Sequence, residues 1–100
     1  MAIHGIAIPM DQLAQLCRRY HVRELALFGS VLRDDFRPES DVDVLVEFEL
    51  GAMIGFLEMA GLQEELEALV GRPVDIVSKP GLHPRMRAAV LGAATVLYAA

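Results

Sequence analysis

The spacing of hydrophobic positions changes several times along this chain and predicts an alternation of helices and strands. Residues 9–20 open with a proline and carry apolar residues at helical spacing, which predicts a first helix. Apolar runs at 24–28, 41–48 and 74–78 are rich in Val, Ile, Leu and Phe and predict three strands. Residues 51–71 alternate apolar and acidic positions and end in glycine, which predicts a long second helix.

Turn residues and prolines divide the rest of the chain. A glycine and a serine at 29–30 follow the first strand and predict a turn into a short helix, and the polar stretch 34–40 predicts a loop. A last helix is expected at 84–92 and a brief strand at 95–98. This order predicts an α/β sheet flanked by helices, and we expect residues 1–100 to form a single domain.

Composition excludes some classes of protein. The chain has 14 acidic residues against 9 Lys and Arg, and the net charge of -5 disfavours nucleic acid as a direct substrate. No apolar stretch reaches the roughly 20 residues that cross a bilayer, so no membrane association is expected. The single Cys17 cannot form an internal disulfide, and the chain shows no signal-peptide pattern. We therefore expect a soluble, cytoplasmic protein.

Three aspartates form the strongest chemical pattern. Asp41 and Asp43 stand two positions apart in a predicted strand, so their side chains project from the same face. Their Cα atoms would lie about 6 to 7 Å apart, near enough for both carboxylates to bind one cation such as Mg²⁺. Asp75 completes the group if its strand lies beside theirs. Three carboxylates on neighbouring strands suit two Mg²⁺ ions and in-line phosphoryl transfer.

A candidate phosphate-binding turn precedes the acidic strand. Gly29 lets the backbone come close to a ligand, and the hydroxyl of Ser30 stands at the start of the predicted short helix, where amides attract phosphate. Arg33 follows three positions later and could add a forked cationic contact. The alternatives are a simple helix cap for Ser30 and a surface ion pair for Arg33.

The spacing of Gly29-Ser30 from Asp41 and Asp43 resembles the signature of the polymerase-β-type nucleotidyltransferase superfamily. Within that superfamily, nearly the whole chain is similar to the minimal nucleotidyltransferase (MNT) family. The segments that carry this similarity are residues 27–33, 40–46 and 72–77.

The resemblance implies a polymerase-β-like fold with a small mixed sheet. It implies that Asp41 and Asp43 are metal ligands and that Asp75 is a third ligand that also orients the nucleophile. Gly29 and Ser30 would bind the triphosphate of the nucleotide.

The resemblance also implies an activity and a partner. Members of the family are commonly antitoxins of HEPN-MNT toxin-antitoxin pairs, and some transfer AMP from ATP to a tyrosine of the HEPN ribonuclease. ATP and two Mg²⁺ ions would be the small partners. The alternative is a binding module that neutralises the HEPN protein by complex formation alone. The sequence leaves open the acceptor, the base preference and whether the chain forms homo- or hetero-oligomers.

Other surface features admit simpler interpretations. The acidic residues Glu64, Glu65 and Glu67 are expected on a solvated helix face or opposite a basic partner. Hydrophobic residues in two regions are candidates for a partner surface. They are Met53, Phe56 and Leu57 in the predicted second helix, and Leu91, Val96, Leu97 and Tyr98 near the C-terminus.

Overall fold

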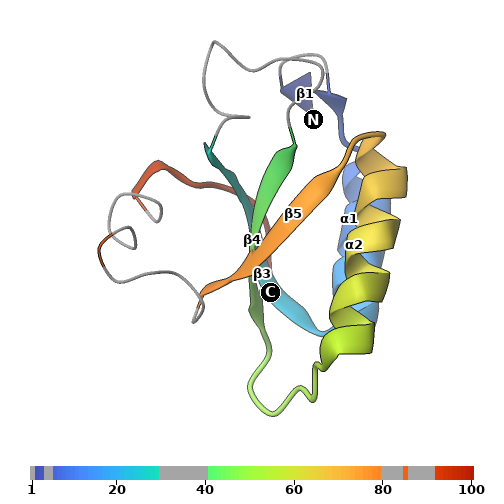
Figure 1. The fold of residues 1–100 in the computed structure, drawn as a ribbon, viewed down its shortest axis with the longest axis vertical. Helices are drawn as coiled ribbons and strands as arrows, with labels where there is room; N and C mark the ends of the chain where they lie inside the picture. The colour runs from blue at the N-terminus through green and yellow to red at the C-terminus, as the bar shows by residue number, and fades with distance from the viewer. Residues whose placement is uncertain (1, 4–5, 30–40, 80–84, 86–91) are drawn as a thin grey trace.

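A mixed four-stranded sheet forms the centre of the fold (Figure 1). The computed structural model describes residues 2–3, 6–29, 41–79, 85 and 92–100. The strand order is β5-β4-β3-β6; β4 pairs parallel with β5, whereas the pairs β3/β4 and β3/β6 are antiparallel. The strands are β3 (Val22–Phe28), β4 (Val42–Phe48), β5 (Val74–Ser78) and β6 (Thr95–Ala99).

Two helices, α1 (Met10–Arg19) and α2 (Phe56–Val70), pack side by side against one face of this sheet (Figure 1). Alternate residues of β4 join the core with buried leucines from both helices, because successive strand residues point to opposite faces. These residues are Val42, Val44 and Val46 of β4, Leu13 and Leu16 of α1, and Leu62 and Leu66 of α2. The other residues of β4, Asp43 among them, therefore face away from the helices.

The strand predictions hold to within two residues, with one addition. The strand predicted at 24–28 begins earlier, at Val22, and the one predicted at 95–98 ends at Ala99. A short antiparallel pair, β1 (Ala2–Ile3) with β2 (Ile6–Ala7), was not predicted. Strands of two residues are too short to show a hydrophobic period.

The second helix begins at Phe56 and not at residue 51, so this prediction was wrong by five residues. Gly51 adopts a positive φ of 82°, and Gly55 is the extended residue before the helix. Two glycines lower the helical tendency of residues 51–55 although the segment is apolar. The predicted end is confirmed: Gly71 has φ 73°, and its N–H donates to the carbonyl oxygen of Glu67 at 2.8 Å.

Two predicted helices fall mainly on residues that are not described: the short helix after residue 30 and the last helix at 84–92. In the described ranges, no helix has the length and apolar character that crossing a membrane requires.

Candidate functional site

The acidic ends of β4 and β5 lie side by side. In this parallel pair Asp43 is the register partner of Asp75, and Val42 is the partner of Val74. The N–H of Val42 also donates to the carbonyl oxygen of Pro73 at 2.9 Å, which ties the beginnings of the two strands together. Asp75 was expected near the first two aspartates only if the two strands are adjacent. They are adjacent, so this condition is met.

Asp43 and Asp75 share the sheet face that points away from the helices, because they are register partners in adjacent strands. Asp41 directly precedes β4 and is exposed, Asp43 is half-buried, and Asp75 is exposed. Within the described ranges, no three His, Cys, Asp or Glu side chains gather closely enough to hold a metal ion. The register thus brings Asp43 and Asp75 to one face, with Asp41 directly before β4, whereas the convergence of the three carboxylates on a cation stays a prediction.

Gly29 lies directly after β3 and touches the site from the other side. Its neighbour Phe28 is the register partner of Asp43, and Gly29 itself has a positive φ of 74°. A Cβ atom at position 29 would lie 3.1 Å from Cγ of Asp43 and closer still to Oδ2. Glycine is therefore required here for two reasons. The backbone conformation favours glycine, and the Asp43 carboxylate fills the space that a side chain would need.

The donor set fits Mg²⁺ on chemical grounds, because carboxylate oxygens are the protein ligands that this ion prefers. The strand ends supply three carboxylates, from Asp41, Asp43 and Asp75. Ser30 and Arg33, the other two residues expected at the site, lie outside the described residues. Their contacts with phosphate stay predictions.

Glu67 helps to position the site, a role that the sequence analysis missed. Its Oε2 accepts a hydrogen bond of 2.9 Å from the backbone N–H of Val74, one residue before Asp75. The bond connects the last turn of α2 to the beginning of β5. The expectation of a merely solvated Glu67 is therefore wrong; the signal was its place in the helical turn just before the glycine-proline connection.

Glu65 is also engaged, on the helical side of the molecule. Its carboxylate accepts hydrogen bonds from Tyr20 Oη at 2.5 Å and from Arg19 at 2.6 Å. These bonds lower the pKa of Glu65, that from Tyr20 most, and the hydrogen bond between Tyr20 and Glu65 raises the pKa of the Tyr20 hydroxyl. Glu65 therefore connects the end of α1 to α2, and the interpretation as a solvated side chain is wrong for it as well.

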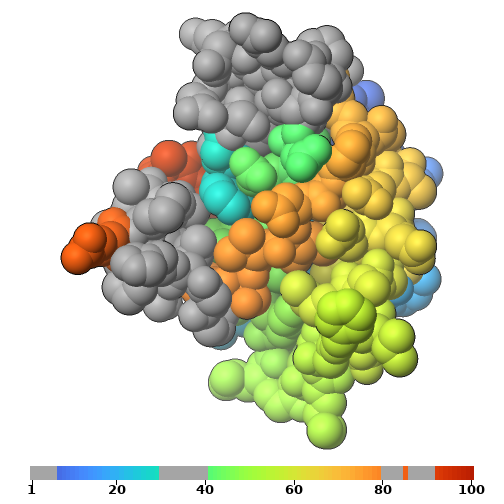
Figure 2. All heavy atoms as spheres, viewed as in Figure 1, coloured from blue at the N-terminus to red at the C-terminus, as the bar shows by residue number. Residues whose placement is uncertain are grey.

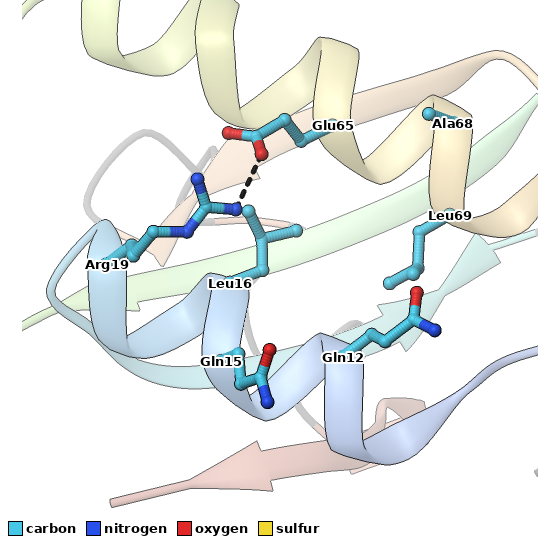
Figure 3. A pocket seen from close by; sticks show the side chains of 7 residues that line it. All are labelled: Gln12, Gln15, Leu16, Arg19, Glu65, Ala68 and Leu69. Atoms are coloured by element: carbon cyan, nitrogen blue, oxygen red, sulfur yellow. Dashed lines mark hydrogen bonds and ion pairs between the residues drawn. The ribbon is translucent and has the colours of Figure 1, made fainter.

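An open hollow lies between α1 and α2 (Figure 3). The Arg19–Glu65 ion pair lies at one end of it, and Gln12 and Gln15 line it from α1. It belongs to the layer of helices, whereas the aspartates occupy the opposite face of the sheet. We place the candidate site at the aspartates because the hollow contributes one neutralised carboxylate and no cluster of metal-binding oxygens. The hollow is lined by Gln12, Gln15, Leu16, Arg19, Glu65, Ala68 and Leu69.

Comparisons with known proteins show the family of the chain. The family model for the nucleotidyltransferase domain matches residues 10–97. The protein adenylyltransferase MntA of Thermococcus cleftensis is 42% identical over 78 residues, which are 77% of this chain and 76% of that protein.

Solved structures share the fold. One that was assigned to the minimal nucleotidyltransferases is 44% identical and superposes with a TM-score of 0.71, covering 85% of each chain. Another is a complex of a tri-AMPylated HEPN toxin with an MNT antitoxin from Shewanella oneidensis. It matches with a TM-score of 0.64 over 91% of this chain and 70% of that one. At 17% identity this second likeness concerns the fold alone.

Proposed function

The chain belongs to the nucleotidyltransferase domain family, as a minimal nucleotidyltransferase, and on this premise we propose that it transfers AMP from ATP to a protein hydroxyl. The observation that carries the proposal is the register of Asp43 with Asp75, beside the turn at Gly29. Support for AMP as the transferred group comes from the 42% identical relative, which is named a protein adenylyltransferase.

Each residue has a distinct task in this proposal. Asp41 and Asp43 hold the metal ions together with Asp75. Gly29 leaves space for the Asp43 carboxylate, and Ser30 and Arg33 bind the triphosphate. Two Mg²⁺ ions, when bound, would stabilise the charge that develops on the attacking and leaving oxygens.

The transfer forms one bond and breaks one. The acceptor hydroxyl oxygen bonds to the α-phosphorus of ATP, the bond between the α-phosphorus and the bridging oxygen breaks, and pyrophosphate leaves. Asp75 orients the hydroxyl, and its carboxylate receives the proton. Gly29 contributes through position, because a misplacement of about 1 Å at Asp43 costs roughly a hundredfold in rate.

We propose a tyrosine of a HEPN-family toxin as the acceptor, which makes this chain the antitoxin of the pair. The support is the family resemblance, together with a fold neighbour solved as an MNT antitoxin with its AMPylated HEPN toxin.

The test is transfer of label from α-labelled ATP to a purified HEPN partner, with the modified residue identified by mass spectrometry. The proposal predicts an AMP-sized mass increase on a tyrosine that requires Mg²⁺ and disappears with EDTA. Parallel reactions with labelled GTP, CTP and UTP define the base preference. If the complex forms but none of the four labelled nucleotides labels the partner, the transfer reaction is rejected.

A further inference from the structure

Four large apolar side chains stand almost fully in solvent around the connection from β4 to α2. We call them the turn patch: Leu50, Met53, Phe56 and Leu57, which are between 82% and 94% exposed. Their segment forms the yellow-green projection at the bottom of Figure 2. Single exposed apolar residues are ordinary, but four within eight positions indicate a surface that another molecule covers.

The turn patch and the aspartates lie at opposite ends of β4. Asp41 and Asp43 stand at the beginning of this strand, whereas Leu50 follows its end at Phe48. A seven-residue strand spans roughly 20 Å, so a molecule on the turn patch leaves the candidate site open. The connection is seen at the bottom of Figure 1, at the end of the sheet to which β4 runs.

The charge around the turn patch is negative. Residues 41–71 contain eight Asp and Glu and no Lys, Arg or His. Glu49 and Glu58, which are next to members of the patch in sequence, are both exposed, and Oε2 of Glu49 lies 3.6 Å from Nδ1 of His21. The nearby cation Lys79 is engaged at 3.2 Å with Glu24 and at 3.6 Å with Glu47. An occupant of this surface therefore meets apolar contact area bordered by carboxylates.

This charge decides between two kinds of occupant. In a symmetric dimer the same surface lies on both copies, so a second copy would bring Glu49 and Glu58 toward the same carboxylates of its partner. Like charges across an interface are unfavourable, whereas opposite charges increase the association rate and specificity. A basic partner fits the surface better than a second copy.

We propose that the turn patch docks the protein substrate through an amphipathic helix whose apolar side chains are bordered by Lys or Arg. This inference rests on the proposed function, since it concerns the partner that receives AMP. Apolar anchors at helical spacing are the usual way in which such a helix binds a hydrophobic surface. The docked helix and the accepting hydroxyl are then different parts of the partner, and binding is separable from transfer.

The test compares four proteins with the same HEPN partner: wild type, Met53→Ser/Phe56→Ser, Glu49→Lys/Glu58→Lys, and Val96→Ser. Val96, a 51% exposed apolar residue on β6, represents the C-terminal candidate region, so Val96→Ser distinguishes that region from the turn patch. Calorimetry measures affinity, the α-label assay measures AMP transfer on the same samples, and circular dichroism checks that each variant is folded.

We expect Met53→Ser/Phe56→Ser to weaken binding by about a hundredfold, as truncation of hot-spot anchors does. Glu49→Lys/Glu58→Lys should weaken binding at low salt and less at high salt, and Val96→Ser should bind as wild type. Full affinity in the folded serine variant, or no complex with wild type, overturns the inference. A patch-dependent complex without AMP transfer rejects the proposed function and leaves the docking surface standing.

Discussion

The carboxylate of Asp43 lies against the backbone of Gly29, in the space that the Cβ atom of any other residue would need. This contact joins the end of β3 to the beginning of β4 on the face where the aspartates lie. It explains physically why a glycine belongs at this distance from the acidic pair. A side chain at position 29 and a correctly placed carboxylate at position 43 exclude each other.

Gly29→Ala should therefore reduce AMP transfer by about tenfold or more, because displacement of a catalytic group is costly. The positive φ of 74° adds strain of about 1 to 2 kcal/mol to the free energy of folding. Gly71→Ala is the matched control, since Gly71 has a φ of 73° and the added Cβ would meet nothing within 4 Å.

Both variants should lose similar stability in urea unfolding, and only Gly29→Ala should lose transfer. Equal transfer rates in the two alanine variants would show that the Gly29–Asp43 contact has no part in the activity.

The alternation of apolar residues predicts much of the site. Val42 and Val44 are buried and Asp43 faces the other way, as the period of two requires. Strand order was not predictable, because a hydrophobic pattern says which face is buried and nothing about which strand is the neighbour. From the sequence, the adjacency that brings Asp75 beside Asp43 could therefore be only a condition.

The start of α2 is a second feature that the sequence pattern did not predict. Residues 51–55 are mostly apolar and extend the helical pattern, yet Gly51 and Gly55 leave them outside the helix. The pattern could not separate apolar residues that enter the core from those that stay exposed, such as Met53 at 91%. That distinction depends on where the helix begins.

The contact between Tyr20 and Gly61 predicts that substitutions at these two positions have non-additive effects on the free energy of unfolding. A Cβ at Gly61 would lie 2.8 Å from Tyr20 Oη, the atom that donates to Glu65. Gly61→Ala gains up to about 1 kcal/mol of helix propensity but displaces the hydroxyl and its hydrogen bond, worth about 1 kcal/mol. We expect a nearly neutral change in the wild type and a clear stabilisation in a Tyr20→Phe background.

A double-mutant cycle from urea unfolding measures this coupling. Additive effects of the two substitutions would contradict the contact.

The pH dependence of stability should reveal the bonds of Glu65. Its pKa is lowered in the folded state, first by the hydrogen bond from Tyr20 and then by that from Arg19. A lowered pKa adds stability above the pKa of the unfolded chain, and this stability disappears as the pH falls through the folded pKa. Glu65→Gln should therefore cost more free energy of unfolding at pH 7 than at pH 3.

Glu64→Gln provides the control, because Glu64 is an exposed carboxylate on the same helix. If Glu65→Gln lowers the free energy of unfolding equally at the two pH values, the hydrogen bonds do not depend on an ionised Glu65.

In the proposed mechanism, nucleotide transfer depends on the aspartates at the beginnings of β4 and β5. The most direct test of this dependence is transfer of α-labelled AMP to the HEPN partner by wild type and by Asp41→Asn/Asp43→Asn, with Asp11→Asn, an exposed aspartate of α1, as the control. We predict that the double variant binds the partner with unchanged affinity and loses transfer by about a hundredfold or more, while Asp11→Asn transfers as wild type. Undiminished transfer by the folded double variant would contradict this dependence.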